Sequence, residues 1–221
     1  MELGGGSIIT SSRKSRTILW PTICLAALLL LAFLAASVLQ GSGFLSPIPP
    51  ASEANPTPVA DTPPERMVDL YRAAFTAWAA LLLFIPAIFA FFKGGGHEKN
   101  LTWKHYWTVS FIAFSVHMYW SMVGFFQGDI AWMTTSTRVS AFWPGIALLI
   151  WWGIDVALAW LHPTPAKWIK WQRQVVHVVA LIMFVGGSLG TGETLPIRAI
   201  GLVALVLGIS AMWLGRTSRK V

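Results

Sequence analysis

The chain has 221 residues, of which 55% are apolar and only 11% are charged, with a mean hydropathy of +0.62. A soluble protein usually carries about a quarter charged residues, so the composition excludes an ordinary soluble domain and favours a protein embedded in a lipid bilayer. It also excludes a disordered chain, and the lone Cys24 excludes a disulfide scaffold and a cysteine-ligated metal centre. The net charge of +7 is spread over segments that flank apolar runs, so we expect no nucleic-acid partner.

Six apolar runs predict an all-α membrane protein. A helix that crosses a bilayer needs about 20 largely apolar residues, and the fifth run is the shortest of the six. We therefore expect a polytopic bundle of about six transmembrane helices. The runs cover residues 18–40, 68–92, 105–127, 139–161, 174–190 and 196–215.

The domain organisation follows from these runs. The first run, 18–40, comes after a basic segment, as in a secretory signal, but it exceeds the usual 7–15-residue apolar region. It is therefore interpreted as an uncleaved signal anchor or first transmembrane helix, with a cleaved signal as the alternative. The other expected parts are a basic cytoplasmic tail (1–17), a Pro-rich extracytoplasmic linker (41–66), a five-helix bundle (67–215) and a second basic tail (216–221).

The positions of Lys and Arg predict the orientation. Twelve of the 16 lie in alternate segments, namely the two tails and the breaks near 93–104 and 167–173, and only Arg66, Arg72, Arg138 and Arg198 lie in the others. Cytoplasmic loops carry the excess of cations. The pattern places both termini in the cytoplasm of a multi-pass protein of a cytoplasmic (inner) membrane, of bacterial type.

Ionisable side chains inside the runs are the candidates for function, because each costs about 2.5–3.5 kcal/mol at the bilayer centre. These are Asp155, His177 and His117. A carboxylate at that depth must be protonated, paired or hydrated, and His177 lies at a depth similar to that of Asp155. We expect the two to form a hydrogen bond that fixes helix rotation; the alternative is a role in proton transfer or cofactor orientation.

Haem b is the cofactor that the histidines would allow, with His117, His105 and His177 as candidate ligands. His117 lies near the middle of its run, about 18 Å along the helix from His105. This mismatch in depth disfavours a haem held by the chain alone, and a hydrogen bond from His117 to a neighbouring hydroxyl or carbonyl is the ordinary expectation. His105, Asp155, His162 and His177 have no known metal-ligand spacing, so we expect no metal site.

Small residues recur along the sixth run at spacings of three and four, which places them on one face of a helix. Small residues let helices approach closely in lipid. We interpret this seam as a packing surface within the bundle, with an oligomerisation surface as the alternative. Its members are Gly201, Ala204, Gly208, Ala211 and Gly215.

The chain contains none of the common catalytic or nucleotide-binding motifs, such as HExxH, a P-loop or GxSxG. We therefore expect an accessory, anchor or assembly subunit without its own catalytic centre, whose partners are the lipid bilayer and either other membrane subunits or further copies of itself. One alternative is a redox subunit that uses haem b or quinone. The other is a small-solute or proton-coupled carrier in which Asp155 is the coupling carboxylate.

Reporter fusions test the predicted orientation. Fusions at residues 97, 167 and 221 should stay in the cytoplasm and a fusion at 130 should be exported, because the cation-rich segments are retained on the inner side. The location of each reporter is measured by its compartment-specific activity. An exported reporter at residue 167 would contradict the six-span topology.

Overall fold

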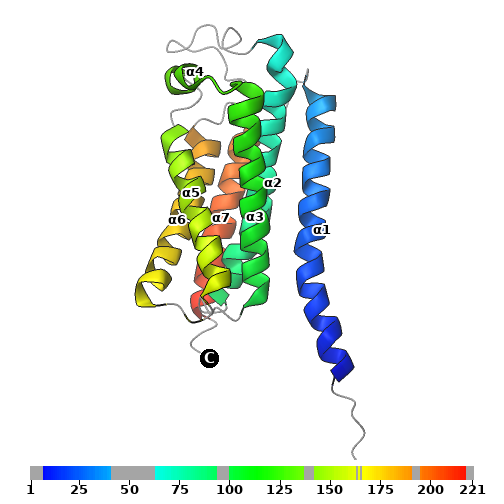
Figure 1. Cartoon of the computed structure of the whole chain (residues 1–221), viewed down its shortest axis with the longest axis vertical. Helices are drawn as coiled ribbons and strands as arrows, with labels where there is room; N and C mark the ends of the chain where they lie inside the picture. Colours follow the sequence, from blue (N-terminus) through cyan, green and yellow to red (C-terminus); the bar gives the residue numbers. More distant parts are fainter. Residues whose placement is uncertain are drawn as a thin grey trace, which may run out of the picture.

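The computed structural model describes residues 7–40, 63–93, 100–136, 142–162, 164, 166–190 and 195–217. Over these ranges the chain is helical and contains no strand, which confirms the predicted all-α class for the described residues. The long helices stand side by side in a bundle (Figure 1). They are α1 (Ser7–Leu39), α2 (Met67–Lys93), α3 (Leu101–Tyr119), α5 (Phe142–Leu161), α6 (Lys167–Gly190) and α7 (Leu195–Thr217).

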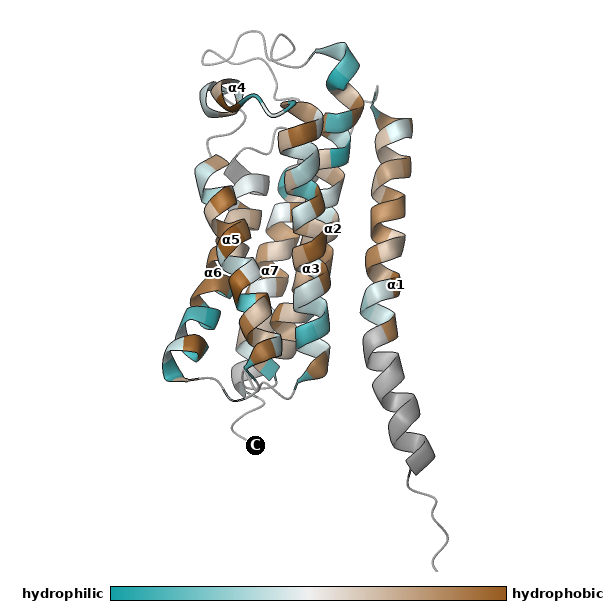
Figure 2. Cartoon of the chain, in the orientation of Figure 1, coloured by the Kyte–Doolittle hydropathy of each residue, from teal (hydrophilic) through white to brown (hydrophobic). Residues whose placement is uncertain are grey.

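The six predicted runs fall largely on these helices, the third extending past the end of α3, but among the described residues four segments are both long and apolar enough to cross a membrane. They are Leu19–Leu39, Pro64–Lys93, Leu101–Phe125 and Phe142–Leu161. The apolar part of α7, Arg198–Leu214, is shorter, and α6 begins with a charged turn. Apolar residues dominate the middle of the long helices, and hydrophilic ones gather near their ends (Figure 2).

Local signals explain where two of the helices begin. A 3-10 turn, η1 (Pro64–Arg66), leads into α2, and Asp69 and Arg72 form an ion pair at 2.9 Å in its first turns. Residues 41–62 of the predicted Pro-rich linker lie outside the described residues. Asn100 caps α3 by accepting a hydrogen bond from the Trp103 backbone at 3.2 Å. Its Nδ2 also donates to the Ala90 carbonyl at 2.9 Å, which ties the start of α3 to the end of α2.

Helix α2 is central, since it packs against α1, α3 and α7. Helix α1 stands at the side of the bundle (Figure 1), where Ala32 and Ala36 pack against Tyr71 and Phe75 of α2. Over residues 19–39, many of the other side chains of α1 are exposed and apolar. Side chains that are more than half exposed include Leu19, Trp20, Leu30, Leu31, Leu34 and Val38.

The small-residue seam of α7 is buried inside the chain. Gly201, Ala204, Gly208 and Ala211 are all buried, and α7 packs there against α2 and α6. A Cβ at Gly208 would lie 3.0 Å from a methyl carbon of Leu181 on α6. The packing interpretation is therefore confirmed, and the alternative of an oligomerisation surface on these four residues is wrong because neighbouring helices already fill the seam.

A turn and a short helix that no sequence pattern predicted lie at the opposite end of the bundle from the start of α3 (Figure 1), around an apolar cluster that includes Phe125, Phe126 and Met133. The chain continues from α3 into a π-helical turn, η2 (Trp120–Phe125), and a short helix, α4 (Ile130–Thr135). Arg66 donates to the Phe125 carbonyl at 3.2 Å and to Gln127 Oε1 at 2.7 Å, so it fastens the start of α2 to this turn. At Gly124, an added Cβ would lie 2.6 Å from the Trp120 ring, so the turn needs a glycine there.

Replacing Gly208 with leucine should destabilise the bundle, because the new side chain overlaps Leu181 at the contact between α7 and α6. Overpacking of this kind typically costs about 1–3 kcal/mol. The matched control is Val206→Leu, since Val206 is 55% exposed on the same helix. Thermal unfolding in one detergent measures both variants, and equal stability of the two would contradict the packing described for α7.

Candidate functional site

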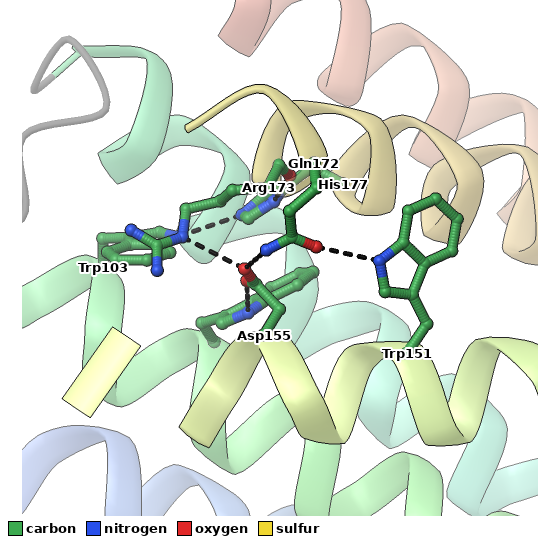
Figure 3. Close-up of polar contacts among 7 residues, drawn as sticks. Trp103, Trp151, Asp155, Gln172, Arg173 and His177 are labelled. Atoms are coloured by element: carbon green, nitrogen blue, oxygen red, sulfur yellow. Dashed lines mark hydrogen bonds and ion pairs between the residues drawn. The ribbon is translucent and has the colours of Figure 1, made fainter. Parts of the chain in front are cut away.

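Asp155 of α5 lies at the centre of a buried hydrogen-bond network (Figure 3). Its side chain is fully buried and accepts three hydrogen bonds. Trp107 Nε1 of α3 donates to Oδ2 at 2.9 Å, and Gln172 Nε2 and Arg173 Nε of α6 donate to Oδ1 at 2.6 Å and 3.2 Å. One carboxylate therefore links three helices.

Arg173 supplies the positive charge of this network, and only 1% of it is exposed. Its guanidinium carbon lies 4.8 Å from the centre of the Trp103 ring, so the cation also rests on an aromatic face. Charges are rarely buried to this extent unless they are paired. The ion pair with Asp155 and the indole of Trp103 together account for how an arginine is held between α3, α5 and α6.

Gln172 extends the network back to α5. Its Oε1 accepts a hydrogen bond from Trp151 Nε1 at 2.8 Å, while its Nε2 donates to Asp155. Trp151 lies one turn before Asp155, on the face of α5 that the helical spacing predicts. His162, which directly follows the end of α5, is exposed.

The predicted hydrogen bond between Asp155 and His177 is wrong. His177 Nδ1 lies 2.7 Å from the Arg173 carbonyl, and because a carbonyl oxygen only accepts, Nδ1 carries the hydrogen. The other ring nitrogen, Nε2, accepts from Trp103 Nε1 at 3.0 Å. Similar depth was a sound guide to proximity, but Gln172 and Arg173, about one turn earlier on α6, donate to Asp155, and His177 packs against Trp103 and Trp107 of α3.

His177 takes part in an aromatic stack that runs across the bundle. Its ring lies 3.7 Å from that of Trp107 and 4.3 Å from that of Phe91, nearly parallel to each. Trp107 also stacks on Trp152 of α5 at 4.4 Å. Because Trp107 donates to Asp155 as well, it connects the ion pair to the stack, and His177 is joined to Asp155 only through it and through Arg173.

The three candidate haem ligands lie at two depths. His105 and His177 lie toward the start of α3, whereas His117 Nδ1 donates to the carbonyl of Ala73 near the start of α2 at 2.8 Å, as expected for an ordinary buried histidine. At 1.5 Å per residue, about 18 Å of helix separates His105 from His117. Iron at either nitrogen of His177 would have to displace Trp103 or the Arg173 carbonyl.

The side chains considered as metal ligands, His105, Asp155, His162 and His177, do not come together in one site. Among the residues that it describes, no three His, Cys, Asp or Glu side chains come together in a group that could hold a metal ion. His162 is exposed. His105 hydrogen-bonds to the Leu101 carbonyl at 2.7 Å and packs edge-on against Trp160. The carboxylate of Asp155 already accepts hydrogen bonds from Trp107, Gln172 and Arg173.

Sequence reasoning missed Arg173, Gln172 and the indole donors Trp103 and Trp107 as members of this site. Arg173 was counted only as a flanking cation, and tryptophans near the ends of apolar runs have an ordinary explanation as an interfacial belt. One signal was present: Arg173 and His177 are four residues apart, so they share one face of a helix. Indole N–H groups carry no charge, and nothing in their spacing marks them as carboxylate ligands.

Comparisons with protein-family models, with curated proteins and with solved structures gave no match to this chain.

Replacing Asp155 with asparagine should strongly destabilise the protein, because Arg173 would keep its charge in the interior without a counter-ion. Removing one partner of a buried ion pair typically costs about 3–5 kcal/mol. The matched control is Asp69→Asn, which breaks the half-exposed pair with Arg72 and should cost about 0–1 kcal/mol. The free energy of unfolding in one detergent is the measurement.

A double-mutant cycle separates the ion pair from its surroundings. Asp155→Asn combined with Arg173→Gln should be less damaging than the sum of the single variants, since the double variant leaves no unpaired charge. Strict additivity in thermal unfolding would show that the two side chains do not interact.

Proposed function

We propose that this chain is an accessory, anchor or assembly subunit of a complex in a bacterial cytoplasmic membrane, without a catalytic centre of its own. The observation that carries the proposal is the state of Asp155. Its carboxylate is fully buried and is engaged by Trp107, Gln172 and Arg173, all from the same chain. Asp155 is the side chain in these helices best suited to chemistry, and its hydrogen bonds instead hold α3, α5 and α6 together.

The same observation argues against a carrier in which Asp155 couples transport to protons. A coupling carboxylate must exchange its proton or ion with water on each side in turn. Asp155 is instead linked through Trp107 to a stack of rings that includes His177 and Trp152. Opening a path to it would require breaking the ion pair and separating that stack.

A six-span topology with both termini cytoplasmic is part of the proposal. The start of α1 and the end of α7 lie at the same end of the molecule (Figure 1), as an even number of crossings requires. In α6 the charged turn ends at Arg173, and the following residues 174–190 rise about 26 Å, close to the roughly 30 Å of a bilayer core. The exposed cations of that segment, Lys167 and Lys170, then face the cytoplasm.

Helix α1 is the element best suited to meet another membrane subunit. It contacts the bundle through a narrow strip that includes Ala32 and Ala36, and its outer face is apolar. A neighbouring helix, or a second copy of the chain, can therefore pack on α1 without rearranging the ion pair or the aromatic stack.

One observation favours a second candidate, a redox subunit with haem b. The Nδ1 of His117 is oriented by the Ala73 carbonyl, and such a hydrogen bond is also how proteins fix imidazoles whose Nε2 binds a metal. A second axial ligand at that depth would have to come from another chain, because His105 lies about 18 Å away.

Purification in a mild detergent tests these alternatives together. We expect the chain to migrate on native gels in a complex with other membrane proteins, in a fixed ratio to them. We also expect the amount of the assembled partner proteins to fall when the gene for this chain is deleted. We expect no haem band in the visible spectrum. A haem band that His117→Ala removes would support the redox candidate instead.

Transport is tested separately in proteoliposomes. Solute or proton uptake by the wild type that Asp155→Asn abolishes, in a variant still folded in the same detergent, would overturn the subunit proposal. Asp69→Asn is the control for a general effect of losing a carboxylate, because Asp69 lies in the half-exposed pair with Arg72.

A further inference from the structure

Arg173 has hydrogen-bonding capacity that the network around Asp155 does not use. Only its Nε donates to Asp155, and both terminal nitrogens, Nη1 and Nη2, are buried without an acceptor among the residues that the structure describes. These nitrogens point away from Asp155 over the Trp103 ring (Figure 3). Buried polar groups without a partner are rare, and each one calls for an explanation such as a bound ion.

Several cations lie on α3 and α6 at this end of the bundle. Lys104 follows Trp103 directly on α3, and Lys167 and Lys170 precede Arg173 on α6. Asp155 is paired already, and the acceptor that best suits this end of the molecule is therefore an anion.

Tryptophans place this end at the level of lipid headgroups. Trp168 and Trp171 on the first turns of α6 are 62% and 68% exposed, and Trp160 at the end of α5 is 44% exposed. Exposed tryptophans at helix ends are typical of the membrane interface. Arg173 is two residues beyond Trp171, so its side chain lies within reach of the phosphate layer.

We propose that Arg173 binds an oxyanion through Nη1 and Nη2, and that this oxyanion is the phosphate of an anionic phospholipid. A guanidinium matches two phosphate oxygens with two parallel N–H donors, and Nε stays on Asp155. Inorganic phosphate offers the same chemistry from solution. Because the two nitrogens are closed off from solvent, the phosphate enters by displacing a side chain that covers them.

The proposal rests on the membrane placement of the start of α6, but not on the subunit role or on which side of the membrane this end faces. A failure of the lipid proposal therefore leaves the partner and haem tests unaffected, and the reverse also holds.

Thermal unfolding in lipid-detergent micelles tests the proposal. The full-length wild type is compared in phosphatidylglycerol, in phosphatidylcholine, and in phosphatidylcholine with inorganic phosphate or with chloride at equal ionic strength. With phosphatidylglycerol at about 100 times its Kd, Tm should rise by roughly 5 °C or more over phosphatidylcholine. The rise should vanish in Arg173→Gln and persist in Lys170→Gln, which removes an exposed cation one turn away.

Arg173→Lys covers the case in which Arg173→Gln does not fold. It keeps the charge but lacks the two-pronged donor, so the preference for phosphatidylglycerol should fall well below that of the wild type. An unchanged preference in Arg173→Lys, or an equal loss in Lys170→Gln, would overturn the proposal, because either would show a general response to charge.

The remaining outcomes identify other sources of the acceptor. Stabilisation by inorganic phosphate alone, with none from phosphatidylglycerol, would reassign the site to a free oxyanion and overturn the lipid assignment. A wild type that neither phosphatidylglycerol nor inorganic phosphate stabilises would overturn the proposal. If the wild type also formed a larger assembly than Arg173→Gln, the result would point to a carboxylate of a neighbouring subunit as the acceptor.

Discussion

The hydrogen bonds to the Asp155 carboxylate are the constraint on which the bundle depends. They join α5 to α3 through Trp107 and to α6 through Gln172 and Arg173, and every group involved is surrounded by apolar side chains. In such surroundings water cannot replace a lost partner, so an unmatched charge is costly. The network therefore sets how far each helix is rotated and how the three are aligned along their axes.

The packing of the interior follows from that alignment. Trp107 can donate to Asp155 and lie flat between His177 and Trp152 only when α3, α5 and α6 have these rotations. Large flat rings fill this part of the bundle. On α7, by contrast, small residues allow close contact between helices, and Gly208 lets Leu181 of α6 approach the backbone. A polar junction thus fixes one side of the bundle, and close apolar contact fixes the other.

This arrangement separates two kinds of polar group. Asp155, Gln172 and His177 have their partners inside the chain, which favours a structural role for them. The terminal nitrogens of Arg173 are the exception, and their place at a cation-rich end of the bundle is the basis for the proposed phospholipid site. The apolar outer face of α1 is the corresponding feature for a protein partner.

Composition and hydrophobic runs were enough to predict the helical class, the positions of the long helices and the presence of Asp155 and His177 inside them, because these depend on residues close together in the chain. The partner of Asp155 was beyond such reasoning. Spacing gives the position of a residue along its own helix, but its partner depends on how neighbouring helices are aligned along their axes and rotated against one another, which packing over the whole bundle decides. For that reason depth selected His177, whereas the tertiary structure selected Arg173, Gln172 and the uncharged indole of Trp107.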